Sequence, residues 1–142
     1  MIPEKIKKKI NYAIVRINAE VIEKNPNIPF QNIQPSRGQG TGFFIDKKGH
    51  ILTCAHVVNS SKNIYVEIPH LSSQKIECDI VFFVPEFDLA LLKTRDFKNK
   101  DYLELGKSNL LKTSDEVFAV GFPKSISTGR SNNIKYTTGI IS

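Results

Sequence analysis

TCAHVV at residues 53–58 places a histidine where a strand-like run ends, and the rest of the sequence is best interpreted around it. Residues 49–52 before it read as a strand, and EFDLALL at residues 86–92 places an aspartate before a second apolar run. A histidine that stands alone in such a place is usually a core or surface side chain. Asp88 is either an acid that needs a partner among apolar neighbours or an exposed acid that opens a turn. Because both residues lie where a strand meets a loop, His56 and Asp88 are predicted to converge over one edge of a β-barrel.

The composition is that of a packed globular protein. Of the 142 residues, 40% are hydrophobic and 24% are charged, and the net charge is +6. A basic chain suits an anionic partner such as nucleic acid, but the lysines are scattered and form no arginine-rich stripe, so nucleic-acid binding is disfavoured. The local cluster at residues 5–9 is interpreted as the solvated face of a short helix.

Periodicity predicts one short helix followed by strands. Ile2, Ile6 and Ile10 recur at the spacing of one helix face, which predicts a helix over residues 3–10. Residues 12–21 alternate and are rich in β-branched side chains, which favours a strand, although a continued helix stays open. Residues 25–38 are expected to form a loop. Further strands are predicted at residues 41–46, 50–53, 64–68, 75–84, 89–93, 116–120 and 134–141.

Short strands with turns at regular spacing indicate an antiparallel barrel or sandwich, which is an all-β fold class. The best hairpin joins residues 41–46 to 50–53 through a tight turn that contains Gly49. No apolar run reaches the length of about 18 residues that a membrane helix needs, so no membrane span is expected. No signal peptide is visible, so the compartment is unknown and is taken as cytoplasmic by default.

Five motifs occur in an order that resembles trypsin-like serine proteases, particularly the bacterial HtrA/Deg branch. They are GTGFF at 40–44, TCAHVV at 53–58, DLALLK at 88–93, GFP at 121–123 and TGIIS at 138–142. The resemblance spans residues 12–142 and implies a Greek-key β-barrel. It divides the chain into an N-terminal helical segment at 1–11, a complete first barrel at 12–112, and the first hairpin of an incomplete second barrel at 113–142.

The same resemblance implies a serine-type endopeptidase that acts on polypeptides. His56 is then the general base, and Asp88 is the carboxylate that orients it. Both residue types suit these roles, because a histidine titrates near neutral pH and a carboxylate that accepts the Nδ1 hydrogen fixes its tautomer. The resemblance implies no cofactor, because the chemistry of the family uses side chains and backbone amides alone.

The family's nucleophile belongs to a GNSGGP-like segment that follows the strand ending near Ser142. No Gly-x-Ser-Gly-Gly string occurs in the sequence, and Ser142 is interpreted as a structural match only. We therefore expect residues 1–142 to be a fragment that is inactive alone. The alternative is a natively short, non-catalytic binding or structural module. Strands beyond residue 111 would leave open edges, which predicts weak protection from hydrogen exchange and favours self-association through the incomplete second barrel.

Other motifs carry less chemistry. Cys54 and His56 would face the same way on a continuing strand, but the family has a small or polar residue at position 54, which favours a packed, inert thiol. GQGTG at 38–42 lacks the third glycine of a dinucleotide fingerprint and precedes a strand. The sequence requires no disulfide. No metal site is expected, because structural-zinc spacing is absent among His50, Cys54, His56, His70 and Cys78.

Overall fold

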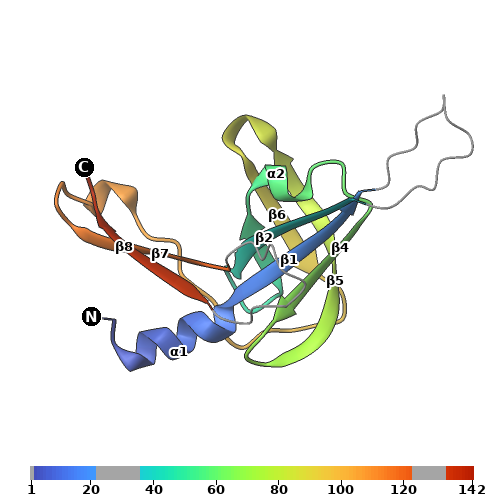
Figure 1. Cartoon of the computed structure of the whole chain (residues 1–142), viewed down its shortest axis with the longest axis horizontal. Helices are drawn as coiled ribbons and strands as arrows, with labels where there is room; N and C mark the ends of the chain where they lie inside the picture. Colours follow the sequence, from blue (N-terminus) through green and yellow to red (C-terminus); the bar gives the residue numbers. More distant parts are fainter. Residues whose placement is uncertain (1, 22–35, 123–133) are drawn as a thin grey trace, which may run out of the picture.

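The computed structural model describes residues 2–21, 36–122 and 134–142, which form a closed six-stranded barrel and a two-stranded sheet (Figure 1). Helix α1 (Glu4–Ala13) leads directly into β1 (Ile14–Val21). The remaining elements are β2 (Ser36–Phe44), β3 (His50–Thr53), α2 (Ala55–Val58), β4 (Asn63–Ile68), β5 (Ser72–Val84), the 3₁₀ turn η1 (Pro85–Phe87), β6 (Leu89–Thr94), the 3₁₀ turn η2 (Ser108–Leu110), β7 (Glu116–Gly121) and β8 (Lys135–Ile140).

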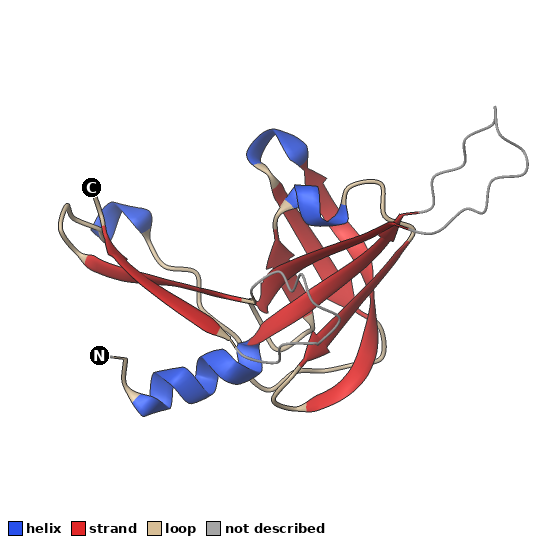
Figure 2. Ribbon diagram, in the orientation of Figure 1, coloured by secondary structure: helices blue, strands red, loops and turns tan. Residues whose placement is uncertain are grey.

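The barrel strands are ordered β1-β2-β3-β6-β5-β4, and β4 returns to pair with β1. Every neighbouring pair is antiparallel. Because β3 pairs with β6 rather than with β4, the connections cross as they do in a Greek key. Figure 2 shows that strands dominate and that helix is confined to short pieces. The predicted all-β fold class, a Greek-key barrel with a short N-terminal helix and a second sheet begun, is therefore confirmed.

Alternation along β1 builds one wall of the core. Val15, Ile17 and Ala19 are fully buried, as expected for one face of a strand. Both interpretations of residues 12–21 hold in part, because α1 extends to Ala13 before the backbone becomes extended. The largest fully buried side chains are Phe44, Ile17, Ile51, Leu92, Val15, Val58 and Val66. The core is thus shared by the strands and by α2.

The turn between β2 and β3 is fixed by a carboxylate and a glycine. Asp46 Oδ1 accepts hydrogen bonds from the backbone amides of Lys48 and His50, at 2.8 and 3.3 Å. Gly49 has φ +85°, where a side chain would be strained and its Cβ would meet Thr94. The predicted hairpin is therefore confirmed, and its glycine is needed for both conformation and space.

The sheet of β7 and β8 lies beside the barrel and is joined by hydrogen bonds to β2 and to helix α1. The Phe122 amide donates to Thr41 Oγ1 at 3.0 Å, and the Tyr136 hydroxyl lies 3.4 Å from Asn11 Oδ1. Among the described strands, β7 and β8 pair only with each other. Weak hydrogen-exchange protection and self-association of this part remain predictions, as do the three segment boundaries drawn from the sequence.

Some boundaries differ from those expected. Strand β2 begins at Ser36, so residues 36–38 belong to a strand and not to the predicted loop. The rest of that loop, residues 25–35, lies outside the described residues. Strand β5 begins at Ser72, earlier than predicted, because it pairs with Ile68 across a short turn. Within the described ranges, no helix combines the length and the apolar content needed to cross a bilayer.

Candidate active site

The segment that carries His56 is helical and not a continuing strand. Strand β3 ends at Thr53, Cys54 is still extended, and α2 begins at Ala55. Ala55 and Val58 are 2% and 0% exposed, and only helical spacing turns two residues that far apart toward the same core. Strand β3 therefore ends at the residue that the sequence predicts, and the turn into α2 lifts the His56 side chain out of the sheet.

Two glycines of β2 let α2 lie close to the barrel. A Cβ on Gly40 would come within 2.6 Å of the Val57 side chain, and one on Gly38 would come within 3.0 Å of the Val57 carbonyl oxygen. A larger residue at Gly40 would push α2, and His56 with it, away from β2. The glycine-rich stretch at 38–42 thus has a packing role, in agreement with the rejection of a dinucleotide site.

Asp88 projects from a sharp turn between β5 and β6. Pro85 starts the 3₁₀ turn η1, and the Asp88 amide closes it by donating to the Pro85 carbonyl at 3.1 Å. Asp88 itself has φ 52° and ψ 44°, a left-handed conformation that aspartate adopts more readily than most residues. Because β6 pairs with β3, with Thr53 opposite Ala90, the turn lies beside the start of α2.

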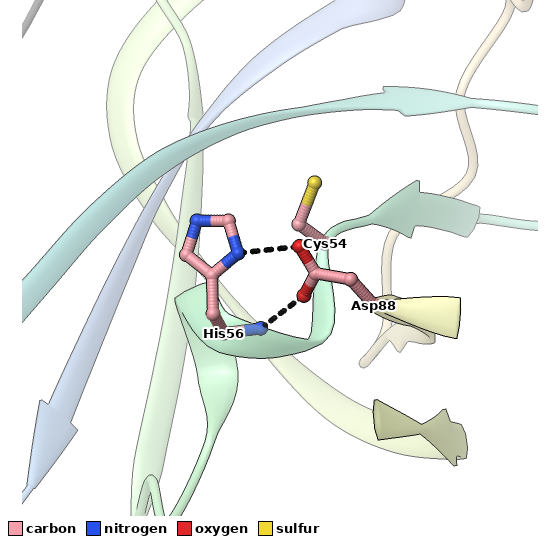
Figure 3. Close-up of side chains that lie close together, drawn as sticks. All are labelled: Cys54, His56 and Asp88. Atoms are coloured by element: carbon pink, nitrogen blue, oxygen red, sulfur yellow. Dashed lines mark hydrogen bonds and ion pairs between the residues drawn. The ribbon is translucent and has the colours of Figure 1, made fainter. Parts of the chain in front are cut away.

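The structure brings His56 and Asp88 into direct contact (Figure 3). The His56 Nδ1 atom lies 2.7 Å from Asp88 Oδ2, and the backbone amide of His56 donates to Asp88 Oδ1 at 2.8 Å. An ionised carboxylate has no proton to give, so Nδ1 must be the donor in this hydrogen bond. The other ring nitrogen points away from Asp88 and is left with a lone pair that can accept a proton.

These two hydrogen bonds stabilise the charged form of Asp88. The backbone amide of His56 first, and its ring second, hold the pKa of the Asp88 carboxyl below its ordinary value, and this outweighs the opposing effect of desolvation. The side chains of His56 and Asp88 are 71% and 49% exposed, so the aspartate is not a buried acid. It is instead an acid at a turn that has also found a partner, which combines both alternatives predicted from the sequence.

A shallow hollow of about 250 Å³ adjoins the histidine. Among the residues that line it, the Arg16 guanidinium lies 4.9 Å from the centre of the Phe122 ring. The residues that line it are Arg16, Gln39, Gly40, Thr41, Cys54, His56, Val57 and Phe122. A reacting group could therefore approach His56 from the side of β2.

Cys54 is exposed, which corrects the expectation of a packed thiol. It lies outside the core because α2 turns inward only from Ala55 onward. Ligand atoms of Cys54, His56 and Asp88 all lie within 4.8 Å of one another. Sequence spacing missed this grouping, because the aspartate follows the histidine by 32 positions and reaches it only through strand pairing.

The other candidate residues lie elsewhere. His50 pairs with Asp46, 2.7 Å from Nδ1 to Oδ2, and His70 makes an edge contact with the Tyr12 ring. Cys78 is buried in the barrel, and burial raises the pKa of its thiol to about 12. Cys54 and Cys78 are both free thiols, so the structure contains no bridge between them.

Sequence reasoning also missed one functional contact, the backbone amide of His56 that holds Asp88 Oδ1. Every residue except proline has a backbone amide, so the sequence does not show which amide will act as a donor. The short helix at Ala55–Val58 orients the amide of His56 toward Asp88. The Pro-Glu-Phe-Asp string at 85–88 was the available signal, since proline favours the first position of such a turn.

Comparison with known proteins gives consistent matches. Residues 40–142 match the family described as the trypsin-like peptidase domain. The chain is 32% identical over 109 residues to the probable periplasmic serine endoprotease DegP-like of Chlamydia pneumoniae, covering 75% of this chain and 22% of that protein. It is 31% identical over 139 residues to the serine protease DegP homolog of Plasmodium falciparum, covering 95% of this chain and 15% of that protein.

A DegP-like serine endoprotease of Pseudomonas putida strain F1 is 38% identical over 84 residues, which cover 59% of this chain and 17% of that protein. The chain thus spans less than a quarter of the length of each of these three relatives. The matched region contains the barrel strands that carry His56 and Asp88. The closed Greek-key barrel, the order of the motifs and the matched residues all agree. The chain therefore belongs to the trypsin-like peptidase family, in its HtrA/DegP branch.

Proposed function

We propose that His56 and Asp88 are the general base and the orienting carboxylate of a serine-type endopeptidase, whose nucleophilic serine is supplied from outside residues 1–142. The observation that carries this proposal is the double contact of Asp88, which accepts hydrogen bonds from both the ring and the backbone amide of His56. Two contacts fix the position and the tautomer of the imidazole. A carboxylate that only balanced charge would not need both.

In the proposed reaction, a serine hydroxyl donates its proton to Nε2 of His56 as the oxygen attacks the peptide carbonyl. The imidazolium that forms is stabilised by ionised Asp88 across the 2.7 Å contact. His56 then returns the proton to the leaving amine. No residue of this chain is assigned as nucleophile or oxyanion donor, since the sequence contains no Gly-x-Ser-Gly-Gly string.

Family membership supports the reaction class, and the names of the relatives support the substrate class. The relatives from Chlamydia pneumoniae and Pseudomonas putida are named serine endoproteases, which cut within polypeptides. We therefore propose polypeptides as substrates. The hollow beside His56 offers room on the β2 side for the residues that flank a scissile bond.

The test uses the whole product of the gene, isolated from its native host, with casein hydrolysis and a fluorophosphonate probe as the two readouts. We expect labelling at a serine, together with hydrolysis that falls by about 10⁴-fold in Asp88→Asn because the tautomer is lost. His56→Ala should abolish labelling. His70→Ala is the matched control, since this exposed histidine contacts only the Tyr12 ring among the described aromatic residues. Full hydrolysis in His56→Ala would overturn the proposal.

A second candidate function is a non-catalytic module that binds polypeptides. The hollow of about 250 Å³ beside His56 would serve such binding without any reaction. The two candidates are separated by the same protein preparation. A module of this kind would bind unfolded casein without hydrolysing it, would show no serine labelling, and would be indifferent to His56→Ala.

A further inference from the structure

We infer that Cys54, His56 and Asp88 form a binding site for a borderline-soft divalent cation, with Zn²⁺ as the best match. The three side chains converge on one exposed point, where each offers a ligand atom within 4.8 Å of the other two (Figure 3). Spacing between cysteines and histidines predicted no metal here. The third ligand, however, is a carboxylate from a strand that is distant in sequence.

The donor set selects the class of metal. A thiolate, an imidazole nitrogen and a carboxylate oxygen are the three ligand types that proteins use for zinc. Ca²⁺ and Mg²⁺ prefer sites made entirely of oxygen, so a thiol disfavours them. Three protein ligands leave a fourth tetrahedral position for water. All three side chains are exposed, so the cation can enter directly from solvent.

The backbone around the ligands is well fixed, while the side chains can adjust. Cys54 follows the paired end of β3, His56 lies on α2, and Asp88 is held in a closed turn. A tetrahedral metal about 2.0–2.1 Å from both atoms would set Nδ1 and Oδ2 about 3.3 Å apart. They are now 2.7 Å apart, and the three ligand atoms lie within 4.8 Å of one another, so rotations of all three exposed side chains would bring them to one cation. The His56 amide can continue to hold Asp88 Oδ1.

Coordination exchanges protons for metal. The thiol proton of Cys54 leaves to solvent, and the ring proton of His56 moves from Nδ1 to Nε2 by exchange with solvent, so the imidazole stays neutral. The cation then accepts one lone pair from Nδ1, one from the thiolate sulfur and one from the carboxylate oxygen. Metal binding needs no nucleophile, so it can be tested independently of peptidase activity. Its consequence for catalysis does rest on the proposed function: a metal on Nδ1 replaces the hydrogen bond to Asp88, and so reversibly disables the base.

The experiment titrates reduced, metal-free protein with Co²⁺, which reports a thiolate ligand by near-ultraviolet charge-transfer absorption, and then displaces it with Zn²⁺. We expect one equivalent to bind with a thiolate band. Cys54→Ala should remove the band, and His56→Ala and Asp88→Ala should each weaken binding by about tenfold or more. Circular dichroism of each variant verifies that it is folded.

The matched control is the other histidine–carboxylate pair. Asp46 and His50 also lie 2.7 Å apart, so His50→Gln should leave the titration unchanged if the site needs Cys54. A band that survives in Cys54→Ala, equal affinity in all variants, or no thiolate band in the wild type would overturn the inference. Failure of serine labelling would leave this titration unaffected, so the two proposals can fail separately.

Discussion

Asp88 accepts two hydrogen bonds from His56, one from the backbone amide and one from the imidazole ring. The division matters because the two donors respond differently to substitution. Any residue but proline at position 56 keeps the amide, while only histidine supplies the ring. The conformation of Asp88, with φ 52°, aims its carboxylate at both donors. A substitution at position 56 therefore separates the effect of the backbone donor on Asp88 from the effect of the ring.

The first prediction concerns the titration of Asp88. Its pKa is lowered in the folded state, chiefly by the His56 amide, so its contribution to stability is complete above the unfolded pKa of about 3.9 and is lost as pH falls through the lower folded value. Carbon NMR of the carboxyl should give a midpoint below that of a free aspartate. In His56→Ala the midpoint should rise only partway, because the amide remains. An ordinary midpoint in the wild type would contradict the geometry.

At the scale of elements, α2 depends on the absence of side chains from β2. A Cβ at Gly40 would lie 2.6 and 2.8 Å from the two methyl carbons of Val57, closer than real atoms approach. Pairing with Ile17 of β1 holds Gly40 in the barrel wall, so the Val57 side chain, and α2 with it, is the part that must yield. The orientation of His56 thus depends on a residue in a neighbouring strand.

The second prediction follows from this packing. Gly40→Ala should lower the free energy of unfolding by about 1–3 kcal/mol through overpacking. If the proposed function holds, the same substitution should lower casein hydrolysis by the whole gene product, because it displaces His56. Urea denaturation measures the first effect. Gly139→Ala on β8 is the control, because a Cβ there meets nothing within 4 Å and should change stability by less than about 0.5 kcal/mol. Equal effects of the two substitutions would refute the packing argument.

The third prediction concerns a buried amide that ties the segment after β6 to the β2–β3 turn. Asn99 Oδ1 accepts from the Gly49 amide at 3.0 Å, and its Nδ2 donates to the carbonyls of Asp46 and Asp101 at 2.7 and 2.9 Å. Asn99→Ala leaves these buried groups unpaired and should cost about 2–4 kcal/mol. Thermal or urea unfolding checks this. The exposed Asn109→Ala should be nearly neutral, and a neutral Asn99→Ala would count against the network.

For the whole molecule, the free energy of folding comes from the barrel core, to which α2 contributes Val58. Phe44 is fully buried and stacks on Phe97, with ring centroids 6.3 Å apart, while Phe82 near the tip of β5 is 64% exposed. Several other apolar side chains of that hairpin are also exposed, namely Ile80, Val81, Phe83, Phe87 and Leu89. Substitutions at the core and at this tip should therefore differ sharply.

The fourth prediction uses that contrast. Phe44→Ala should destabilise the fold by about 3–5 kcal/mol, through lost burial and the cavity left behind. Phe82→Ala should change stability by less than about 0.5 kcal/mol, because its side chain is already in solvent. Chemical denaturation measures both changes in the free energy of unfolding, provided that the dependence on denaturant concentration is the same in each variant. If Phe82→Ala proved as costly as Phe44→Ala, Phe82 would have to be covered in the protein in solution.

Much of the barrel could be predicted from the sequence, because strand alternation and turn residues are local signals. Gly49 and the strand-like runs at 41–46 and 50–53 predict one hairpin, and the order of the motifs predicts the family. The short helix at Ala55–Val58 could not be predicted, since it depends on the burial of Ala55 and Val58 against strands that are distant in sequence. The contact of His56 with Asp88 was inferred from resemblance, whereas its distances, its exposure and the nearness of Cys54 depend on tertiary structure.

The claim that Asp88 fixes His56 as a base is tested most directly by nitrogen NMR of the His56 ring, at a pH where the imidazole is neutral. The 2.7 Å contact predicts that Nδ1 carries the proton and that Nε2 is unprotonated and free to accept one. Asp88→Ala should shift the population toward the other tautomer, which free imidazole side chains favour. A wild-type ring protonated at Nε2 would contradict the account, since its base position would already be occupied.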